Sequence, residues 1–198
     1  AVFALLIAIS YYVPALWVVT TIISPLPIAW YSASYERSQA ISMTIVAIAI
    51  TFFLGGLLIL PLAVVYGVAG LVIGDAIRLK KSKLYLFIAT SLAILFTFAI
   101  IYLITVRLFN VDFIKDSFGL LRESFIQANN LSEQVNGQVV IPKDQLDLTL
   151  NMLNAIIPAS ITISVALFAL VIISINLPLL KRFKIIVPKF SQFKSMRL

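Results

Sequence analysis

The chain has 198 residues, of which 62% are hydrophobic and 12% charged, and its mean hydropathy is +1.09. This composition lies outside the range of soluble globular domains and predicts a membrane protein with several helical spans. The net charge of +7 does not indicate nucleic-acid binding, because the basic residues cluster at the ends of apolar segments, where retention of positive charge in the cytoplasm places them.

Several kinds of chemistry are excluded by residues that the sequence lacks. There is no cysteine and no histidine, so disulfide bonds, thiol nucleophiles, the commonest zinc ligands and the usual proton shuttle are not available. The sequence also has no glycine-rich phosphate loop and no pair of acidic residues within an apolar segment. We therefore expect no metal, no cofactor and no enzymatic activity.

The N-terminal segment, residues 1–12, is apolar but short. As a helix it would be about 18 Å long, whereas a membrane span needs roughly 20 residues, so we expect the chain to begin inside its first membrane helix. Ala4 and Ala8 lie one helical turn apart. Small residues at this spacing allow close approach of another helix, which is either a helix of the same chain or a docked membrane partner.

Residues 15–33 form a second apolar segment, which carries Pro25 and Pro27. Proline removes a helical hydrogen bond, so the sequence predicts a broken or kinked span. Breaks at membrane depth are tolerated where they are buried in protein or line a cavity, and an ordinary proline kink is the alternative. The candidate ligand pocket combines this break with aromatic and polar residues of other segments: Trp17, Pro25, Pro27, Tyr66 and Asn154.

The next three spans are predicted at residues 39–54, 57–77 and 84–106, with Gly55 and Gly56 separating the first two. The fourth span carries a face of small residues suited to close helix packing: Gly67, Gly70 and Gly74. A basic loop that contains Lys80 and Lys81 follows this span. The positive charge of this loop places it on the cytoplasmic side.

Residues 110–150 contain six acidic and three basic residues. Apolar residues recur at intervals of three and four on both sides of a polar turn at 129–138, which predicts an amphipathic helical hairpin on the external face. The last span is predicted at 152–180 with a kink at Pro158, and residues 181–198 form a basic cytoplasmic tail. Residues 1–198 are therefore expected to form one membrane domain with six passes and both ends in the cytoplasm.

Proline and glycine motifs occur along the chain in this order: Pro14, Pro25-Leu26-Pro27-Ile28, Gly67 with Gly70 and Gly74, Pro158, and Asn176 to Phe183 followed by Val187-Pro188 and Phe193 to Leu198. This order resembles the YybS family of bacterial membrane proteins, a domain of unknown function. The resemblance covers nearly the whole chain and implies a location in the bacterial cytoplasmic membrane. Such proteins are similar in fold to the S components of energy-coupling-factor vitamin transporters and to the rod-shape protein MreD, which implies an all-α transmembrane bundle of six helices.

Two functions remain open at this point. The similarity to S components implies a small-molecule binding or transport component, in which Ala4 and Ala8 dock a membrane partner. The similarity to MreD implies a scaffold or regulatory subunit that recruits partners or anionic lipid through the hairpin and the basic tail. The expected partners are the lipid bilayer and either another membrane protein or a second copy of the chain. A polar, roomy cavity beneath the hairpin would favour binding, and a solid core with an exposed apolar groove would favour scaffolding.

Overall fold

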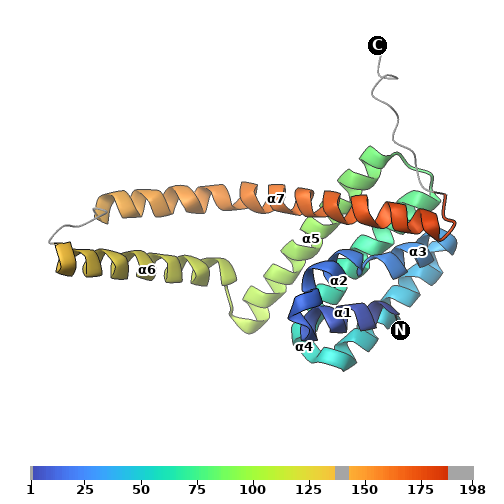
Figure 1. Ribbon diagram of the computed structural model, residues 1–198, viewed down its shortest axis with the longest axis horizontal. Coiled ribbons are helices and arrows are strands. Elements are labelled where there is room, and N and C mark those ends of the chain that lie inside the picture. The colour runs from blue at the N-terminus through green and yellow to red at the C-terminus, as the bar shows by residue number, and fades with distance from the viewer. Residues whose placement is uncertain (1, 137–142, 187–198) are drawn as a thin grey trace, which may run out of the picture. The chain divides into compact units, whose positions relative to one another are not determined.

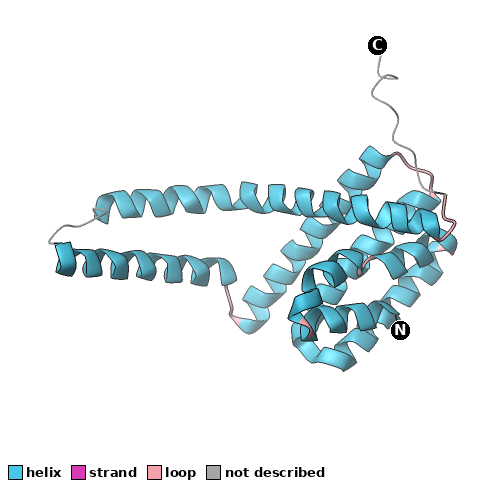
Figure 2. Cartoon of the chain, in the orientation of Figure 1, coloured by secondary structure: helices cyan, strands magenta, loops and turns pink. Residues whose placement is uncertain are grey.

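The computed structural model describes residues 2–136 and 143–186, and these residues form helices joined by short turns, with no strand among them (Figures 1 and 2). The elements are α1 (Val2–Tyr12), the 3-10 turn η1 (Pro14–Leu16), α2 (Trp17–Ile23), α3 (Leu26–Ser34), α4 (Arg37–Arg78), α5 (Lys83–Phe109), α6 (Phe113–Asn136) and α7 (Lys143–Arg182). The all-α class predicted from the composition is confirmed over these residues, whereas the likeness to S components stays a prediction.

The helices form two compact units. Unit 1 comprises Ala1–Ala99 and Ser164–Leu198, and unit 2 comprises Ile100–Ile163. The boundary falls within α5 and within α7, so each of these two helices contributes residues to both units.

Four helical stretches among the described residues are long and apolar enough to cross a membrane: Pro14–Ser34, Arg37–Arg78, Lys83–Phe109 and Leu148–Arg182. α4 has 42 residues and bends at Gly56, whose φ of 66° and ψ of −156° is accessible to glycine and strained for other residues. A straight helix of this length would measure about 63 Å, roughly twice the hydrocarbon thickness. The bend divides α4 into two segments that each have the length of one span.

The helix that follows η1 breaks at Pro25, one of the two prolines from which the sequence predicts an interruption. α2 ends at Ile23 and α3 begins at Leu26. The last carbonyl groups of a helix lack partners within that helix. One of them, on Ile22, accepts a hydrogen bond at 2.8 Å from Nδ2 of Asn176 on α7. Asn176 is fully buried, so the break lies against protein, as irregular backbone at membrane depth requires.

α3 packs closely on the C-terminal half of α4 through two glycines of α4 (Figure 1). A Cβ atom at Gly70 would lie 2.7 Å from the carbonyl oxygen of Pro25, and one at Gly74 would lie 2.5 Å from that of Ala29. Both distances are shorter than real Cβ contacts, and the atoms that would be met belong to the backbone. Any residue with a side chain at either position would therefore push the two helices apart.

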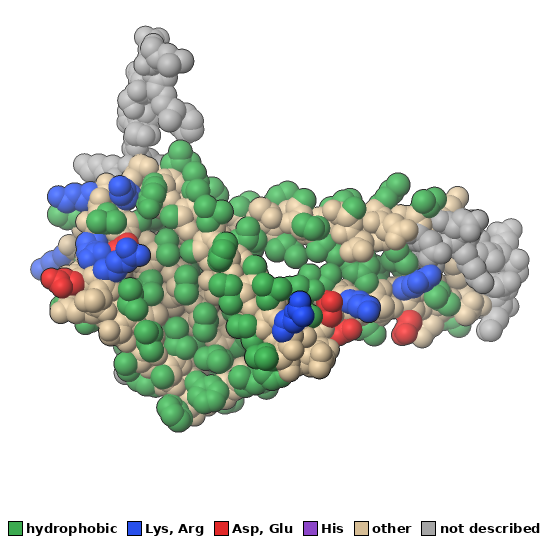
Figure 3. Space-filling view, turned by 180° about the vertical axis from the view of Figure 1, so that it is seen from behind, with side chains coloured by type: hydrophobic (Ala, Val, Ile, Leu, Met, Phe, Trp, Pro, Cys, Tyr) green, Lys and Arg blue, Asp and Glu red, His purple; other side chains and the backbone are tan. Residues whose placement is uncertain are grey.

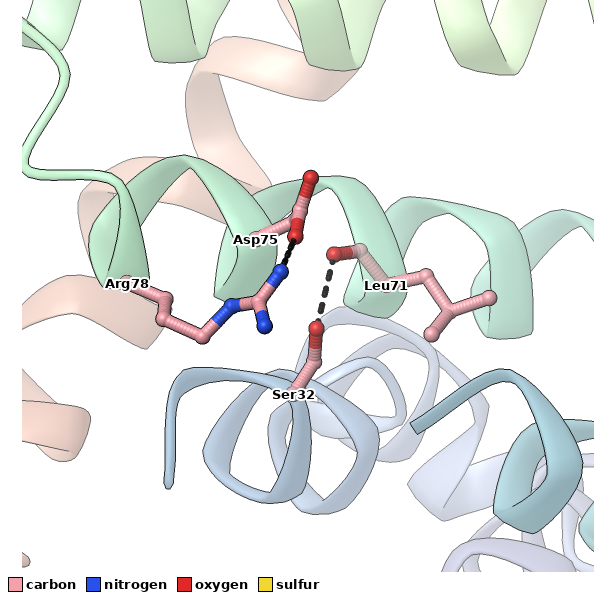
Figure 4. Close-up of polar contacts among 4 residues, drawn as sticks. All are labelled: Ser32, Leu71, Asp75 and Arg78. Atoms are coloured by element: carbon pink, nitrogen blue, oxygen red, sulfur yellow. Dashed lines mark hydrogen bonds and ion pairs between the residues drawn. The ribbon is translucent and has the colours of Figure 1, made fainter. Parts of the chain in front are cut away.

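Polar contacts accompany this packing near the C-terminal end of α4. Ser32 on α3 donates a hydrogen bond to the carbonyl oxygen of Leu71 at 3.1 Å, and Arg78 forms an ion pair with Asp75 one turn away (Figure 4). α4 ends at Arg78, and Lys80 follows two residues later with a left-handed φ of 52°. This is the position after the C-cap, where glycine is the commonest residue.

The surface of unit 1 is largely apolar on the face that Figure 3 shows. Phe53 and Leu58 on α4 and Phe96 on α5 have 85%, 75% and 73% of their surface exposed. Apolar exposure on this scale is unfavourable in water and is the expected surface of a helix that contacts lipid.

α7 differs from the prediction at its N-terminal end. The sequence predicts a hairpin that ends at residue 150 and a last span that begins at residue 152, whereas α7 is one helix from Lys143 to Arg182. The predicted boundary marks a change from polar to apolar composition, and such a change does not interrupt the backbone. Pro158 lies inside the helix without ending it, since membrane helices tolerate proline. The second arm of the hairpin and the last span are therefore the same helix.

Candidate ligand site in the helical hairpin

Unit 2 contains a cavity of about 480 Å³ between the last turns of α5, the first turns of α6 and the N-terminal half of α7. Within this unit α6 and α7 lie side by side (Figure 1). The volume falls within the range of roughly 300–1,000 Å³ that is typical of small-molecule sites. The lining combines charged side chains, two carboxamides and an apolar wall.

Asp112 and Tyr102 form one end of the cavity. The Oδ1 atom of Asp112 accepts hydrogen bonds from the backbone N–H of Lys115 and from the hydroxyl of Tyr102, each at 3.0 Å. Asp112 is thus the N-cap of α6. Donation from the Lys115 N–H holds the pKa of the Asp112 carboxyl below its ordinary value of 3.8. This carboxylate is therefore ionised at neutral pH and already bonded to the protein.

Basic and amide side chains line the cavity from two helices. Lys115 and Arg122 are seven residues apart on α6, which places them on one face about 10 Å apart along the helix axis. Asn151 and Asn154, three residues apart, line the cavity from α7. Figure 3 shows charged side chains along this part of the hairpin. Ammonium, guanidinium and carboxamide groups all donate hydrogen bonds, so residues that can act as donors line one space from both helices.

Gly119 leaves space in the α6 wall of the cavity. It lies between Lys115 and Arg122 on the lining face, and a Cβ atom there would meet no heavy atom within 4 Å. The apolar part of the lining is formed by Ile114, Phe118 and Leu150. The cavity therefore offers hydrogen-bond donors and apolar contact beside an unfilled position.

Unit 1 also contains a cavity at the C-terminal end of α4. It measures about 340 Å³, and Arg37, Asp75 and Tyr85 contribute its polar edge. Asp75 is already paired with Arg78, and Ser32 at the same edge is bonded to the α4 backbone. The hairpin cavity is larger, at about 480 Å³, and is lined by charged and carboxamide side chains from two helices, so it is the stronger candidate for a ligand site.

The residues predicted to form a ligand pocket are distributed over both units. Asn154 lines the hairpin cavity in unit 2, whereas Trp17 lines a separate cavity of about 250 Å³ in unit 1. Pro25 and Tyr66 are buried in unit 1, and Pro27 is half-buried just after the α2–α3 break. Trp17 and Asn154 thus belong to different cavities, and Asn154 is the predicted residue that lies in the candidate site.

The residues predicted for docking or helix packing lie in unit 1. Ala4 is 1% exposed and Ala8 is half-buried, so Ala4 packs inside the unit. A Cβ atom at Gly67 would lie 3.2 Å from side-chain atoms of Thr44 and Ile48 in the first half of α4. Together with the two glycines that contact α3, this places the glycine face of α4 in the interior of the unit.

Sequence reasoning did not single out Lys115, Arg122 or Asn151. In a sequence, polar positions on an amphipathic helix look like a solvated face, and an isolated asparagine carries no signal. The signal present was the spacing of Lys115, Gly119 and Arg122, which puts two cations and a residue without a side chain on one helical face.

Similarity to known proteins agrees with this membrane architecture. The family described as "Predicted membrane protein (DUF2232)" matches residues 1–198. A curated relative, "Uncharacterized protein YybS" of Bacillus subtilis (strain 168), is 21% identical over 199 residues, which cover 100% of this chain and 64% of the relative. No solved structure matches the chain. The match over the whole length shows that the chain belongs to the DUF2232 family of predicted membrane proteins.

Proposed function

We propose that this multi-pass membrane protein is a small-molecule binding component, with its ligand held in the hairpin cavity of unit 2. The observation that carries the proposal is the cavity itself, at about 480 Å³, with donors from α6 and α7. A cavity lined by both hydrogen-bonding and apolar groups is the feature expected of a binding protein, whereas a scaffold needs a surface and no internal space.

Delivery or transport of the bound molecule requires a partner in this proposal. The resemblance to S components supports a membrane protein that docks on the N-terminal helix. Ala8 on α1 is half-buried in the isolated chain and so keeps part of its surface available for such a contact. The cytoplasmic location of the basic α4–α5 loop and of the C-terminal tail is part of the same proposal, because positive charge next to a span is retained in the cytoplasm.

A scaffold role is the second candidate, and one observation favours it. Phe113, Leu120 and Leu131 on α6 are 62%, 67% and 63% exposed. Helical geometry places these three residues on one face, roughly opposite the face of Lys115 and Arg122 that lines the cavity. This apolar face offers a surface on which a partner protein could dock, which is the contact that a scaffold requires.

Two substitutions at Gly119 test the binding function. Gly119→Ala adds a methyl group where no heavy atom lies within 4 Å, and Gly119→Leu adds a side chain large enough to enter the cavity. The Cβ atom that both changes add has no heavy atom within 4 Å, so we expect both proteins to fold. The wild-type protein and both variants would be purified in nanodiscs, and bound small molecules would be identified by mass spectrometry after extraction.

We expect a small molecule to be retained by the wild-type protein and by Gly119→Ala, and to be lost from Gly119→Leu at unchanged melting temperature. The same retained molecule in all three proteins would show that the cavity is not its site. A wild-type protein that retains nothing and gains no thermal stability from any compound of a metabolite library would favour the scaffold role.

A further inference from the structure

We infer that the ligand of the hairpin cavity is an anion carried on an apolar body, such as a phosphate or carboxylate with a hydrocarbon part. This inference rests on the proposed binding function and names the class of molecule that the site accepts.

The charges of the lining select an anion. Among the residues that the structure describes, the lining contains two cations from one face of α6, Lys115 and Arg122, and one carboxylate, that of Asp112. Oδ1 of this carboxylate is occupied by the backbone N–H of Lys115 and the hydroxyl of Tyr102. A cationic ligand would be repelled by the two cations, whereas an anionic ligand would accept charge-assisted hydrogen bonds from them.

The amide side chains of α7 support the same choice. Asn151 and Asn154 line the cavity together with Lys115 and Arg122, so an anion between the helices has donors on both sides. Guanidinium groups bind carboxylate and phosphate in a bidentate manner, and ammonium groups bind them as point charges. The donor set therefore fits oxyanions with two or three oxygen atoms.

The rest of the lining requires an apolar part on the same ligand. An apolar wall is formed by Ile114, Phe118 and Leu150. Beside Gly119 there is unfilled space, because a Cβ atom there would have no heavy atom within 4 Å. A bare inorganic anion would leave this apolar wall exposed to water, which is unfavourable, whereas a hydrocarbon group on the ligand would cover the wall. α7 is apolar enough to span the membrane from Leu148 onward, so one side of the cavity is formed by a membrane-spanning helix.

Two sources could supply such an anion, namely a lipid headgroup of the bilayer and a water-soluble organic anion. Both share the chemistry of an oxyanion on an apolar body. The experiment therefore uses lauryl phosphate as its first probe, and then phosphatidylglycerol and phenyl phosphate as competitors that represent the lipid source and the soluble source.

Binding of lauryl phosphate would be measured by native mass spectrometry on the full chain in phosphatidylcholine nanodiscs. We expect Lys115→Gln and Arg122→Gln each to raise the Kd by at least about tenfold, because each change removes a charge-assisted hydrogen bond to the anion. Lys115→Arg keeps the charge and should keep most of the affinity. Arg107→Gln removes a cation of unit 2 that does not line the cavity, and should leave the Kd within about twofold.

The outcomes separate this inference from the proposed function. Equal binding of dodecyltrimethylammonium, or equal losses in Lys115→Gln and Arg107→Gln, would overturn the anion inference. If Gly119→Leu still removed the natural ligand in that case, the binding function would stand and the ligand class would be wrong. Displacement of lauryl phosphate by phosphatidylglycerol alone would assign the site to a lipid, and displacement by phenyl phosphate would assign it to a soluble anion.

Discussion

The side chain of Asn176 on α7 donates a hydrogen bond to the carbonyl oxygen of Ile22 on α2 at 2.8 Å, across 154 positions of the sequence. The same Nδ2 atom donates to the carbonyl oxygen of Ile172 in its own helix, also at 2.8 Å. The first of these bonds lies just before Pro25, where the chain passes from α2 to α3. A polar side chain from a distant helix thus supplies a donor that the broken helix lacks.

Replacement of this donor should destabilise unit 1. In Asn176→Leu the carbonyl oxygen of Ile22, a half-buried residue, would lose this partner, at a cost of about 1–3 kcal/mol. Thermal unfolding in detergent would measure the loss. Ile175→Leu, a neighbouring change at a side chain that is 39% exposed, serves as the control and should have little effect. Equal melting temperatures for the two variants would contradict the role of Asn176.

Side chains at the α3–α4 contact should separate the two helices. Gly74→Ala places a Cβ atom 2.5 Å from the carbonyl oxygen of Ala29, and we expect it to lower the free energy of unfolding by about 1–3 kcal/mol. Gly74→Leu should cost more. Gly119→Ala is the matched control, since it meets no neighbour and should stabilise α6 by up to about 1 kcal/mol. If both alanine variants unfold at the wild-type temperature, the close contact does not exist.

The two alanines of α1 should respond differently to tryptophan. Ala4 is 1% exposed, so Ala4→Trp overfills the interior of unit 1 and should destabilise the protein by about 1–3 kcal/mol. Ala8 is half-buried, so Ala8→Trp should leave the protein folded and block co-purification of a membrane partner. Melting temperature and co-purification would be measured on the same samples. Retention of the partner by a folded Ala8→Trp protein would rule out docking on this face.

Membrane topology can be tested by cysteine labelling, because the chain has no native cysteine. We expect Lys81→Cys to be protected from an impermeant thiol reagent in intact cells and Asn130→Cys to be labelled, since the basic loop is retained in the cytoplasm. A permeant reagent should label both positions. External labelling at position 81 with protection at position 130 would require the opposite orientation.

The cap on α6 should make the stability of unit 2 depend on acidic pH. Because the native pKa of Asp112 lies below its ordinary value of 3.8, the unfolded chain binds the proton more readily than the folded one. The stabilisation is therefore complete well above pH 4 and is lost as the pH falls through the native pKa. Asp112→Asn removes the charge, so its melting temperature should be lower than that of the wild type at pH 7. The difference should shrink towards pH 3, and a constant difference would contradict the titration.

Local sequence features determined the class of the protein and two of the positions where its helices are interrupted, whereas the boundary predicted between residues 150 and 152 does not interrupt α7. The high apolar content predicts membrane helices because segments in lipid must be apolar and must satisfy their backbone internally. The chain breaks at Pro25 and bends at Gly56, where proline and glycine alter the backbone directly. The amphipathic period of the hairpin likewise predicted α6, since an apolar stripe at helical spacing is a local property.

Tertiary structure decided which faces meet. The sequence does not show that Asn176 lies beside Ile22, or that Gly74 lies against Ala29, because both contacts depend on the packing of helices far apart in the chain. The ligand site could not be predicted from the sequence for the same reason. On α6 alone, Lys115 and Arg122 look like part of a solvated face, and only the packing of α7 places Asn154 in the same cavity. Helical spacing defines which residues share a face, and the neighbour of that face is set by the packing free energy of the folded protein.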